Sequence, residues 1–262
     1  MTAGSGEGRQ PAACLLLAVL FTIVLAAGYL AFRWFNTPGN RTPLVLAWLN
    51  GPGEHPEWAV MAGQRCGGAP FILPTDGFIG YLWGDTFRPS HRHQGLDIFG
   101  GGDVNQKAVV AAYPGYLTRL PDWKSSVIIR IPDDPLRPGR QIWIYYTHLA
   151  DPSGVSYIEP EFPPGTAEAF VRAGTLLGYQ GNYSSDPDNP TGLHLHFSIV
   201  RDDGQGHFTN ELDISNTLDP SPYLGIEVNA ARRSQEPATC LDDPIPLEPL
   251  NPHSHLLGAI AR

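Results

Sequence analysis

The sequence predicts a mainly β fold, an antiparallel sheet domain that follows one apolar N-terminal helix. Four short runs rich in β-branched and aromatic residues indicate strands, and Gly, Pro, Asp and Asn separate them. The runs read VVAAY, SVIIRI, QIWIYYTHL and LHLHFSIV. The 262 residues include 29 Gly and 26 Pro but only 16% charged residues, which favours short strands and many turns over long helices.

The first element is the uncharged segment Pro11–Phe32, and we predict a transmembrane helix over 11–33. As a helix, this segment would extend about 33 Å, close to the roughly 30 Å of a bilayer core. A cleaved signal peptide is the alternative, since the small residues AAG at 26–28 could form a cleavage site. A helix buried within the protein is a third interpretation. Arginines flank both ends of the segment, so the positive-inside rule does not determine which end of the helix would face the cytoplasm.

The rest of the chain divides by composition. Residues 1–10 form an N-terminal tail, and 34–67 form a connector rich in Gly and Pro. The strand signals define a β-domain over 68–225, in which a short helix is expected over 167–173 after two prolines. The segment 226–262 is rich in Pro and has little periodicity, so we expect a surface tail.

Several function classes are excluded by what the sequence lacks. The net charge is −9 and no run of Lys or Arg occurs, whereas nucleic-acid binding requires a basic stripe. There is no HExxH of the thermolysin type of zinc site. There is also no GxSxG or SxxK, which removes the common serine hydrolases and penicillin-binding enzymes.

Histidines gather in three short motifs. These are HQGLD at 93–97, YTHL at 146–149 and GLHLHF at 192–197. Side chains alternate between the two faces of a strand, so both histidines of the last motif share one face, and its leucines and phenylalanine share the other. The apolar face can enter a core while the imidazoles point into a cleft. Two histidines on a solvent face, however, need no ligand.

Together the motifs offer a zinc site. One carboxylate and two imidazoles suit Zn²⁺ and leave a fourth position for water, as catalytic zinc requires. His93 and Asp97 supply one of each, and the HxH motif supplies another imidazole. His91 could compete as a ligand, but the residue four positions later is Gly95 rather than a carboxylate. A second HxH at 253–255 has no accompanying motif, and we interpret it as non-functional.

These motifs resemble those of the lysostaphin-like zinc metallopeptidases, family M23, also called the LytM or peptidase M23 domain. HQGLDI resembles the HxGxDI of that family, and YTHLA resembles its YxHL. VRAGTLLGYQGN followed by TGLHLHFSI resembles its glycine turn and HLHF motif, and LDPSPYL resembles the motif that ends the domain. The resemblance covers roughly residues 70–224.

The resemblance implies a function and residue roles. His93, Asp97 and His196 match the zinc ligands, and His148 and His194 match the two histidines that assist catalysis. The expected fold is then an antiparallel sheet with a zinc-containing groove. The expected activity is cleavage of peptide crosslinks in bacterial cell-wall peptidoglycan by a zinc-dependent endopeptidase. The peptidoglycan peptides would be the substrate, and the catalytic domain would be extracytoplasmic and anchored to the membrane by the N-terminal helix.

Three insertions depart from the family pattern, over 133–140, 151–164 and 182–190, and we expect them to wall the groove and affect substrate preference. Two alternatives remain open. A related zinc D,D-carboxypeptidase would normally carry a Glu shortly before the last histidine, where this chain has Gly-Leu-His. A non-catalytic regulator of other wall hydrolases would normally have lost ligands. A further interpretation is an extracytoplasmic β-domain whose histidines are unrelated and form no functional site.

The cysteines predict one disulfide. Cys14 lies in the apolar segment, and no CxxC occurs, so Cys66 and Cys240 are the pair left. They flank the two ends of the expected domain, and domain ends are often close in space. A disulfide between them would also agree with a domain outside the cytosol.

Overall fold

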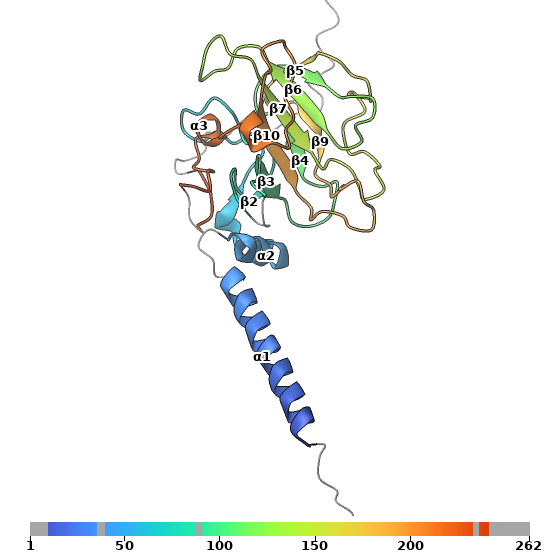
Figure 1. Ribbon diagram of the computed structural model, residues 1–262. Coiled ribbons are helices and arrows are strands. Elements are labelled where there is room, and N and C mark those ends of the chain that lie inside the picture. The colour runs from blue at the N-terminus through green and yellow to red at the C-terminus, as the bar shows by residue number, and fades with distance from the viewer. Residues whose placement is uncertain (1–9, 36–39, 87–90, 233–235, 241–262) are drawn as a thin grey trace, which may run out of the picture.

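The computed structural model describes residues 10–35, 40–86, 91–232 and 236–240 of the chain (Figure 1). Figure 1 shows a β-domain with short helices at its side and one long helix, α1 (Gln10–Phe35), that projects from it. Helix and strand content in these residues confirms the predicted mainly β, antiparallel class.

The main sheet has nine strands among the described residues, in the order β1-β2-β3-β10-β7-β6-β5-β8, and β11 also pairs with β10. All these pairings are antiparallel. The strands are β1 (Ala59–Val60), β2 (Gly77–Tyr81), β3 (Leu96–Phe99), β5 (Gly115–Thr118), β6 (Val127–Ile131), β7 (Ile142–Thr147), β8 (Ala169–Val171), β10 (Leu195–Arg201) and β11 (Thr217–Leu218). A second sheet contains β4 (Ala108–Val110) and β9 (Leu176–Tyr179).

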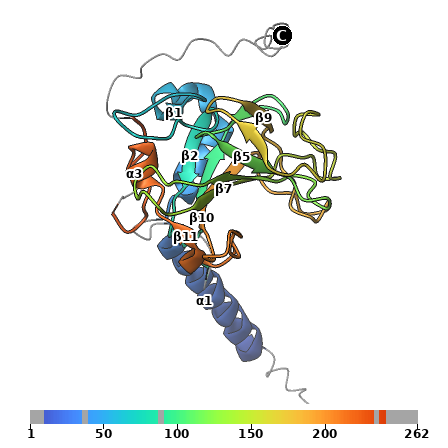
Figure 2. The same cartoon turned by 90° about the horizontal axis from the view of Figure 1, so that it is seen from above.

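Strand β10 is central because it pairs with β3, β7 and β11. Figure 2 shows β7 and β10 side by side, with β11 next to β10. Leu195, Phe197 and Ile199 of β10 are fully buried in the main core, as their alternation in the sequence predicts. The opposite face of β10 therefore presents His196 and Ser198 to the polar side of the sheet.

The connector is more ordered than its composition suggests. It contains α2 (Thr42–Asn50), followed by the short 3₁₀ turns η1 (Pro52–Glu54) and η2 (Pro56–Trp58). Val45 and Trp48 of α2 pack on Phe78 of β2 and Phe99 of β3. The Trp48 indole also donates a hydrogen bond to the Phe99 carbonyl, at 2.7 Å. Helix α2 is thus part of the folded domain.

The packed region also extends beyond 225. The last elements are η3 (Ile214–Asn216) and α3 (Ser221–Leu224), after which Ile226, Val228 and Ala238 are buried in the main core. A disulfide joins Cys66 to Cys240, which confirms the predicted pairing. The start of the Pro-rich segment therefore belongs to the fold, because its apolar residues complete the core that the sheet leaves open.

Arg41 links these two ends of the fold. Its side chain is almost fully buried and donates hydrogen bonds to the carbonyls of Ile79 and Gly80 in β2, at 3.0 and 2.5 Å. It also donates to the carbonyl of Glu236, at 2.8 Å. The connector, the second strand and the C-terminal segment are therefore held together by one guanidinium group.

Two sequence expectations need correction. The short helix expected over 167–173 is wrong, because Ala169–Val171 form β8, which pairs with β5 and lies at the edge of the sheet. The helix over 11–33 exists as α1, and its described large apolar side chains are more than half exposed. Within the described part of the chain, however, no helix has the length and apolar character that a membrane crossing requires. The predicted membrane-spanning role of α1 therefore lacks this support.

Candidate metal centre

Sheet register brings the predicted site residues together. Asp97 of β3 and His196 of β10 are direct partners across the antiparallel pair, and Thr147 of β7 is the partner of His196 on its other side. Directly opposed residues share one face of a sheet, with Cβ atoms about 4.5–5.5 Å apart. His93 lies just before β3, and His194 lies just before β10. The two motifs therefore meet at adjacent strands.

Three ligand atoms converge on one point. His93 Nε2 lies 3.0 Å from Asp97 Oδ1 and 3.1 Å from His196 Nδ1, and the last two atoms are 2.9 Å apart. The three side chains form a buried group able to hold a metal ion. In tetrahedral zinc sites with bonds of about 2.0–2.1 Å, neighbouring donor atoms lie about 3.3 Å apart. The spacing and the two-nitrogen, one-oxygen donor set therefore fit Zn²⁺.

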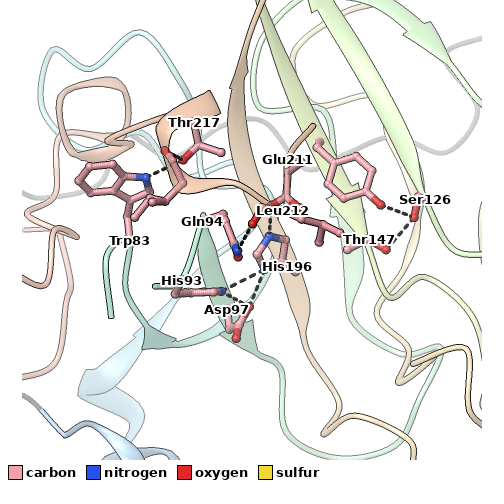
Figure 3. Close-up of polar contacts among 12 residues, drawn as sticks. Trp83, His93, Gln94, Asp97, Ser126, Thr147, His196, Glu211, Leu212 and Thr217 are labelled. Carbon is pink, nitrogen blue, oxygen red and sulfur yellow. Dashed lines mark hydrogen bonds and ion pairs between the residues drawn. The ribbon is translucent and has the colours of Figure 1, made fainter. Parts of the chain in front are cut away.

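In each of the two candidate ligand histidines, one ring nitrogen points toward the other ligands and the second, outer nitrogen points away from them. Both outer nitrogens make hydrogen bonds. His93 Nδ1 lies 3.0 Å from the carbonyl oxygen of Leu82. His196 Nε2 lies 2.8 Å from Glu211 Oε1, a contact that Figure 3 shows. A carbonyl or carboxylate oxygen only accepts, so each outer nitrogen carries the proton. With a metal bound, the inner nitrogens would offer their lone pairs to it, as metal ligation requires.

His148 and His194 show the same arrangement. His148 Nδ1 lies 2.6 Å from the Tyr183 carbonyl oxygen, and His194 Nδ1 lies 2.7 Å from the Gly192 carbonyl oxygen. Both rings therefore keep an unprotonated Nε2 when neutral. The ring centroids are 4.5 Å apart, and His194 Nε2 lies 3.5 Å from Asp97 Oδ1. The two predicted catalytic histidines thus stand beside the ligand group.

Burial and charge set the protonation states of these groups. Burial, with His194 and His196 nearby, lowers the pKa of His148 to about 3. Burial also lowers the pKa of His194, although Asp97 opposes that shift. Both rings are therefore neutral near pH 7 and able to accept a proton.

The ligand side chains behave differently. Burial alone would raise the pKa of Asp97, but His93 and His194 hold it well below its usual range. Burial alone would lower the pKa of His196, but Glu211 and Asp97 raise it to about 10 in the metal-free protein. A metal ion that bound at this site would therefore displace a proton from His196.

Several neighbours of the site were not predicted from the sequence. Glu211 lies fifteen positions after His196 in a loop with no motif, so nothing in its spacing marks it. Leu82 and Tyr183 act through backbone carbonyls, which any residue type provides. Gln94 is the variable residue after His93 in the first motif, and its amide donates a hydrogen bond to the Leu212 carbonyl at 2.7 Å (Figure 3).

Two other histidines among the described residues, His91 and His207, do not belong to the ligand group. The His91 ring centroid is 6.4 Å from that of His93, so His91 neighbours the site without joining the three ligands. His207 is exposed and pairs with Asp203 at 3.2 Å. The second HxH motif, at 253–255, lies outside the described residues.

Comparison with known proteins gives distant likenesses. No family model and no curated protein matches the chain. Ten chains of solved structures do match. The catalytic domain of a mutant of the prophage-encoded M23 protein EnpA from Enterococcus faecalis is 18% identical with a TM-score of 0.34, over 57% of this chain and 95% of that one.

A second match is a protein from Ruminococcus gnavus assigned as a glycyl-glycine endopeptidase, lytM. It is 22% identical with a TM-score of 0.37, over 61% of this chain and 59% of that one. Likenesses of this size do not transfer an activity, whereas the ligand geometry is a property of this chain itself. These two solved structures, to which the chain is similar, are M23 peptidase domains.

Proposed function

We propose that this chain is a zinc-dependent endopeptidase of the M23 type that hydrolyses peptide crosslinks of bacterial peptidoglycan. The observation that carries the proposal is the convergence of His93 Nε2, Asp97 Oδ1 and His196 Nδ1 within 3.1 Å of one another. Two neutral histidines stand beside them, as a hydrolytic site requires. The resemblance of the motifs supplies the substrate class.

The ligand group is prepared for a divalent metal. His93 and His196 would bind through their inner nitrogens, and Asp97 would add one negative charge. Bound Zn²⁺ lowers the pKa of a water molecule and polarises a carbonyl oxygen. Three protein ligands leave a coordination position for the reactants, and the described cysteines stand outside this group.

His148 and His194 supply proton transfer. Each has its Nδ1–H committed to a backbone carbonyl, so each Nε2 can accept the proton that the attacking water releases. Once protonated, the same Nε2–H can stabilise the developing oxyanion or pass its proton to the leaving amine. The C–N bond breaks, the carbonyl carbon gains the hydroxyl group, and the amine gains the proton.

The alternatives fit the site less well. A D,D-carboxypeptidase would use a glutamate as the base near the last ligand. Here the partly buried carboxylate of Glu211 is hydrogen-bonded to the outer nitrogen of His196, on the side away from the donor atoms. A non-catalytic regulator needs no proton-transfer groups, yet both assisting histidines are present and oriented. These contacts favour the endopeptidase.

We also propose an extracytoplasmic, membrane-attached location, which the cleavage of wall peptides requires. Two observations support it. A disulfide such as Cys66–Cys240 persists in oxidising compartments. In addition, α1 exposes large apolar side chains in succession, such as Leu15, Leu20 and Phe21, and burying them in lipid would remove their contact with water.

Membrane fractionation of the full chain, before and after washing with carbonate, tests the attachment. Recovery of the uncleaved chain in the wash would reject it.

The activity is tested with the full chain and purified peptidoglycan. We expect crosslinked fragments to shorten, with new amine and carboxylate ends identified by mass spectrometry. Chelation should stop the reaction, and added Zn²⁺ should restore it. The His196→Ala variant is the matched control and should be inactive. Intact crosslinks after incubation with protein whose zinc content has been confirmed would reject the proposed activity.

A further inference from the structure

The loop between β10 and η3 returns to the metal centre. After the turn at 202–208, Glu211 and Leu212 lie beside His196 and Gln94 (Figure 3). Within the loop, the Asn210 side chain accepts a hydrogen bond from the Leu212 amide at 3.1 Å. The position of Glu211 is therefore set by its own loop and by contacts with both metal motifs.

The contact between Glu211 and His196 is direct and largely shielded from water. Glu211 Oε1 accepts from His196 Nε2 at 2.8 Å, and the two side chains are 15% and 10% exposed. A carboxylate that loses most of its water needs such a donor, because an unpaired buried charge is costly. The contact also fixes the His196 ring, whose Nδ1 lies 2.9 Å from Asp97 Oδ1.

The two ligand histidines are supported unequally. His93 donates its outer N–H to a neutral carbonyl, that of Leu82, whereas His196 donates to a carboxylate. A carboxylate acceptor fixes the tautomer of a ligand histidine and increases its basicity more than a neutral acceptor does. His196 is therefore the ligand whose binding strength depends on a second charged side chain.

Gln94 holds the loop that carries Glu211. Its side-chain amide donates to the Leu212 carbonyl at 2.7 Å, and the residue is almost fully buried. Gln94 lies between the ligands His93 and Asp97 in the sequence, so the first motif reaches the Glu211 loop through it. A shift of this loop would move the carboxylate away from His196.

We propose that Glu211 is a positioning residue for the ligand His196, and that Gln94 acts through Glu211 by fixing its loop. This inference rests on the proposed zinc site, which it deepens. It assigns to the β10–η3 loop a role in metal affinity that the three ligand motifs do not contain.

Zinc affinity of the full chain, measured by competition with a chromophoric chelator, tests the proposal. We expect Glu211→Ala to weaken zinc binding about 10–100-fold. Glu211→Gln keeps an acceptor oxygen of the same size but removes the charge, so it should lose less. Glu168→Gln is the matched control, because Glu168 pairs with Arg130 on the exposed edge of the sheet. It should bind zinc as the unmodified protein does.

A double-mutant cycle tests the route through Gln94. Gln94→Ala should weaken zinc binding in the natural background and add little in the Glu211→Ala background, because its effect requires the carboxylate. The visible spectrum of the cobalt-substituted protein should shift in Glu211→Ala, since the environment of a ligand changes. Circular dichroism should give the same spectrum for Glu211→Gln, which is isosteric, as for the unmodified protein, and this checks that the variant is folded.

The outcomes separate this inference from the proposed activity. If Glu211→Ala and Glu211→Gln bind zinc within threefold of the unmodified protein while His196→Ala does not bind it, the positioning role is overturned. Additive losses in the cycle would overturn the role of Gln94. A third outcome is that the unmodified chain binds zinc and the Glu211 variants bind it more weakly, but the unmodified chain leaves peptidoglycan intact. In that case the positioning role stands and the proposed activity fails.

Discussion

Asp97 and His196 face each other directly across β3 and β10, with Oδ1 and Nδ1 2.9 Å apart. The two residues are 99 positions apart in the sequence, and the sheet pairing alone brings them together. The neighbouring strand β7 places Thr147 opposite His196 and leads directly into His148. The central sheet therefore positions both the candidate metal ligands and the histidines that we propose transfer protons.

Removal of a ligand should remove the metal. We expect His93→Ala and Asp97→Ala to lose most of the bound zinc, because a two-ligand remnant no longer supplies the donor set. Elemental analysis of purified protein measures this. His207→Ala, at an exposed histidine paired with Asp203, is the control and should retain full zinc. Full zinc in both ligand variants would show that the ligands are assigned incorrectly.

Removal of His148 or His194 should lower the activity but leave the bound zinc in place, unlike removal of a ligand. His148→Ala and His194→Ala are expected to keep zinc but to lower kcat about 10²–10⁴-fold, the usual contribution of a positioned acid or base. Metal content and turnover of wall peptides are measured on the same samples. Turnover close to that of the unmodified protein in both variants would contradict their roles.

The disulfide should stabilise the domain. Cys66 and Cys240 close a loop of 174 residues, so Cys66→Ser is expected to lower the free energy of unfolding by about 2–5 kcal/mol. Denaturant unfolding under non-reducing conditions gives the value. Cys14→Ser serves as the control, because Cys14 is exposed on α1 and unbridged. Alkylation of both Cys66 and Cys240 in unreduced, unfolded protein would show that the bridge is absent.

The tyrosine of the YTHL motif should have a structural role. Tyr146 is fully buried, and its hydroxyl accepts a hydrogen bond from the Ala112 amide at 2.9 Å. Tyr146→Phe leaves that buried amide without this acceptor, which should cost about 1–3 kcal/mol of unfolding free energy. Zinc content and kcat should change little. Tyr157→Phe, at a partly exposed position, is the matched control, and an equal loss there would argue against the assigned cause.

The strands and the convergence of His93, Asp97 and His196 could be predicted from the sequence for different reasons. Runs such as SVIIRI contain enough β-branched residues to indicate a strand locally, and the HxH spacing places two imidazoles on one strand face. Glu211 could not be predicted this way, because its contact with His196 depends on the path of a loop. The helix expected over 167–173 failed because pairing with β5 outweighed local preference. The packed tail was missed because its few apolar residues, such as Val228, show no period.

The alternation of β10 has a further consequence for how the chain avoids misfolded pairings. A slip of one residue between β3 and β10 would reverse the faces of the strand, turning Phe197 outward and His196 into the core. A chain with this shifted register would expose the aromatic ring of Phe197, bury the imidazole of His196 and separate the candidate metal ligands. Burial of Leu195 and Phe197 therefore favours a single alignment of these strands, and binding of the proposed zinc ion would favour the same alignment. Metal added during refolding should therefore increase the yield of correctly folded protein, because it would bind and stabilise only chains in which β3 and β10 are correctly aligned.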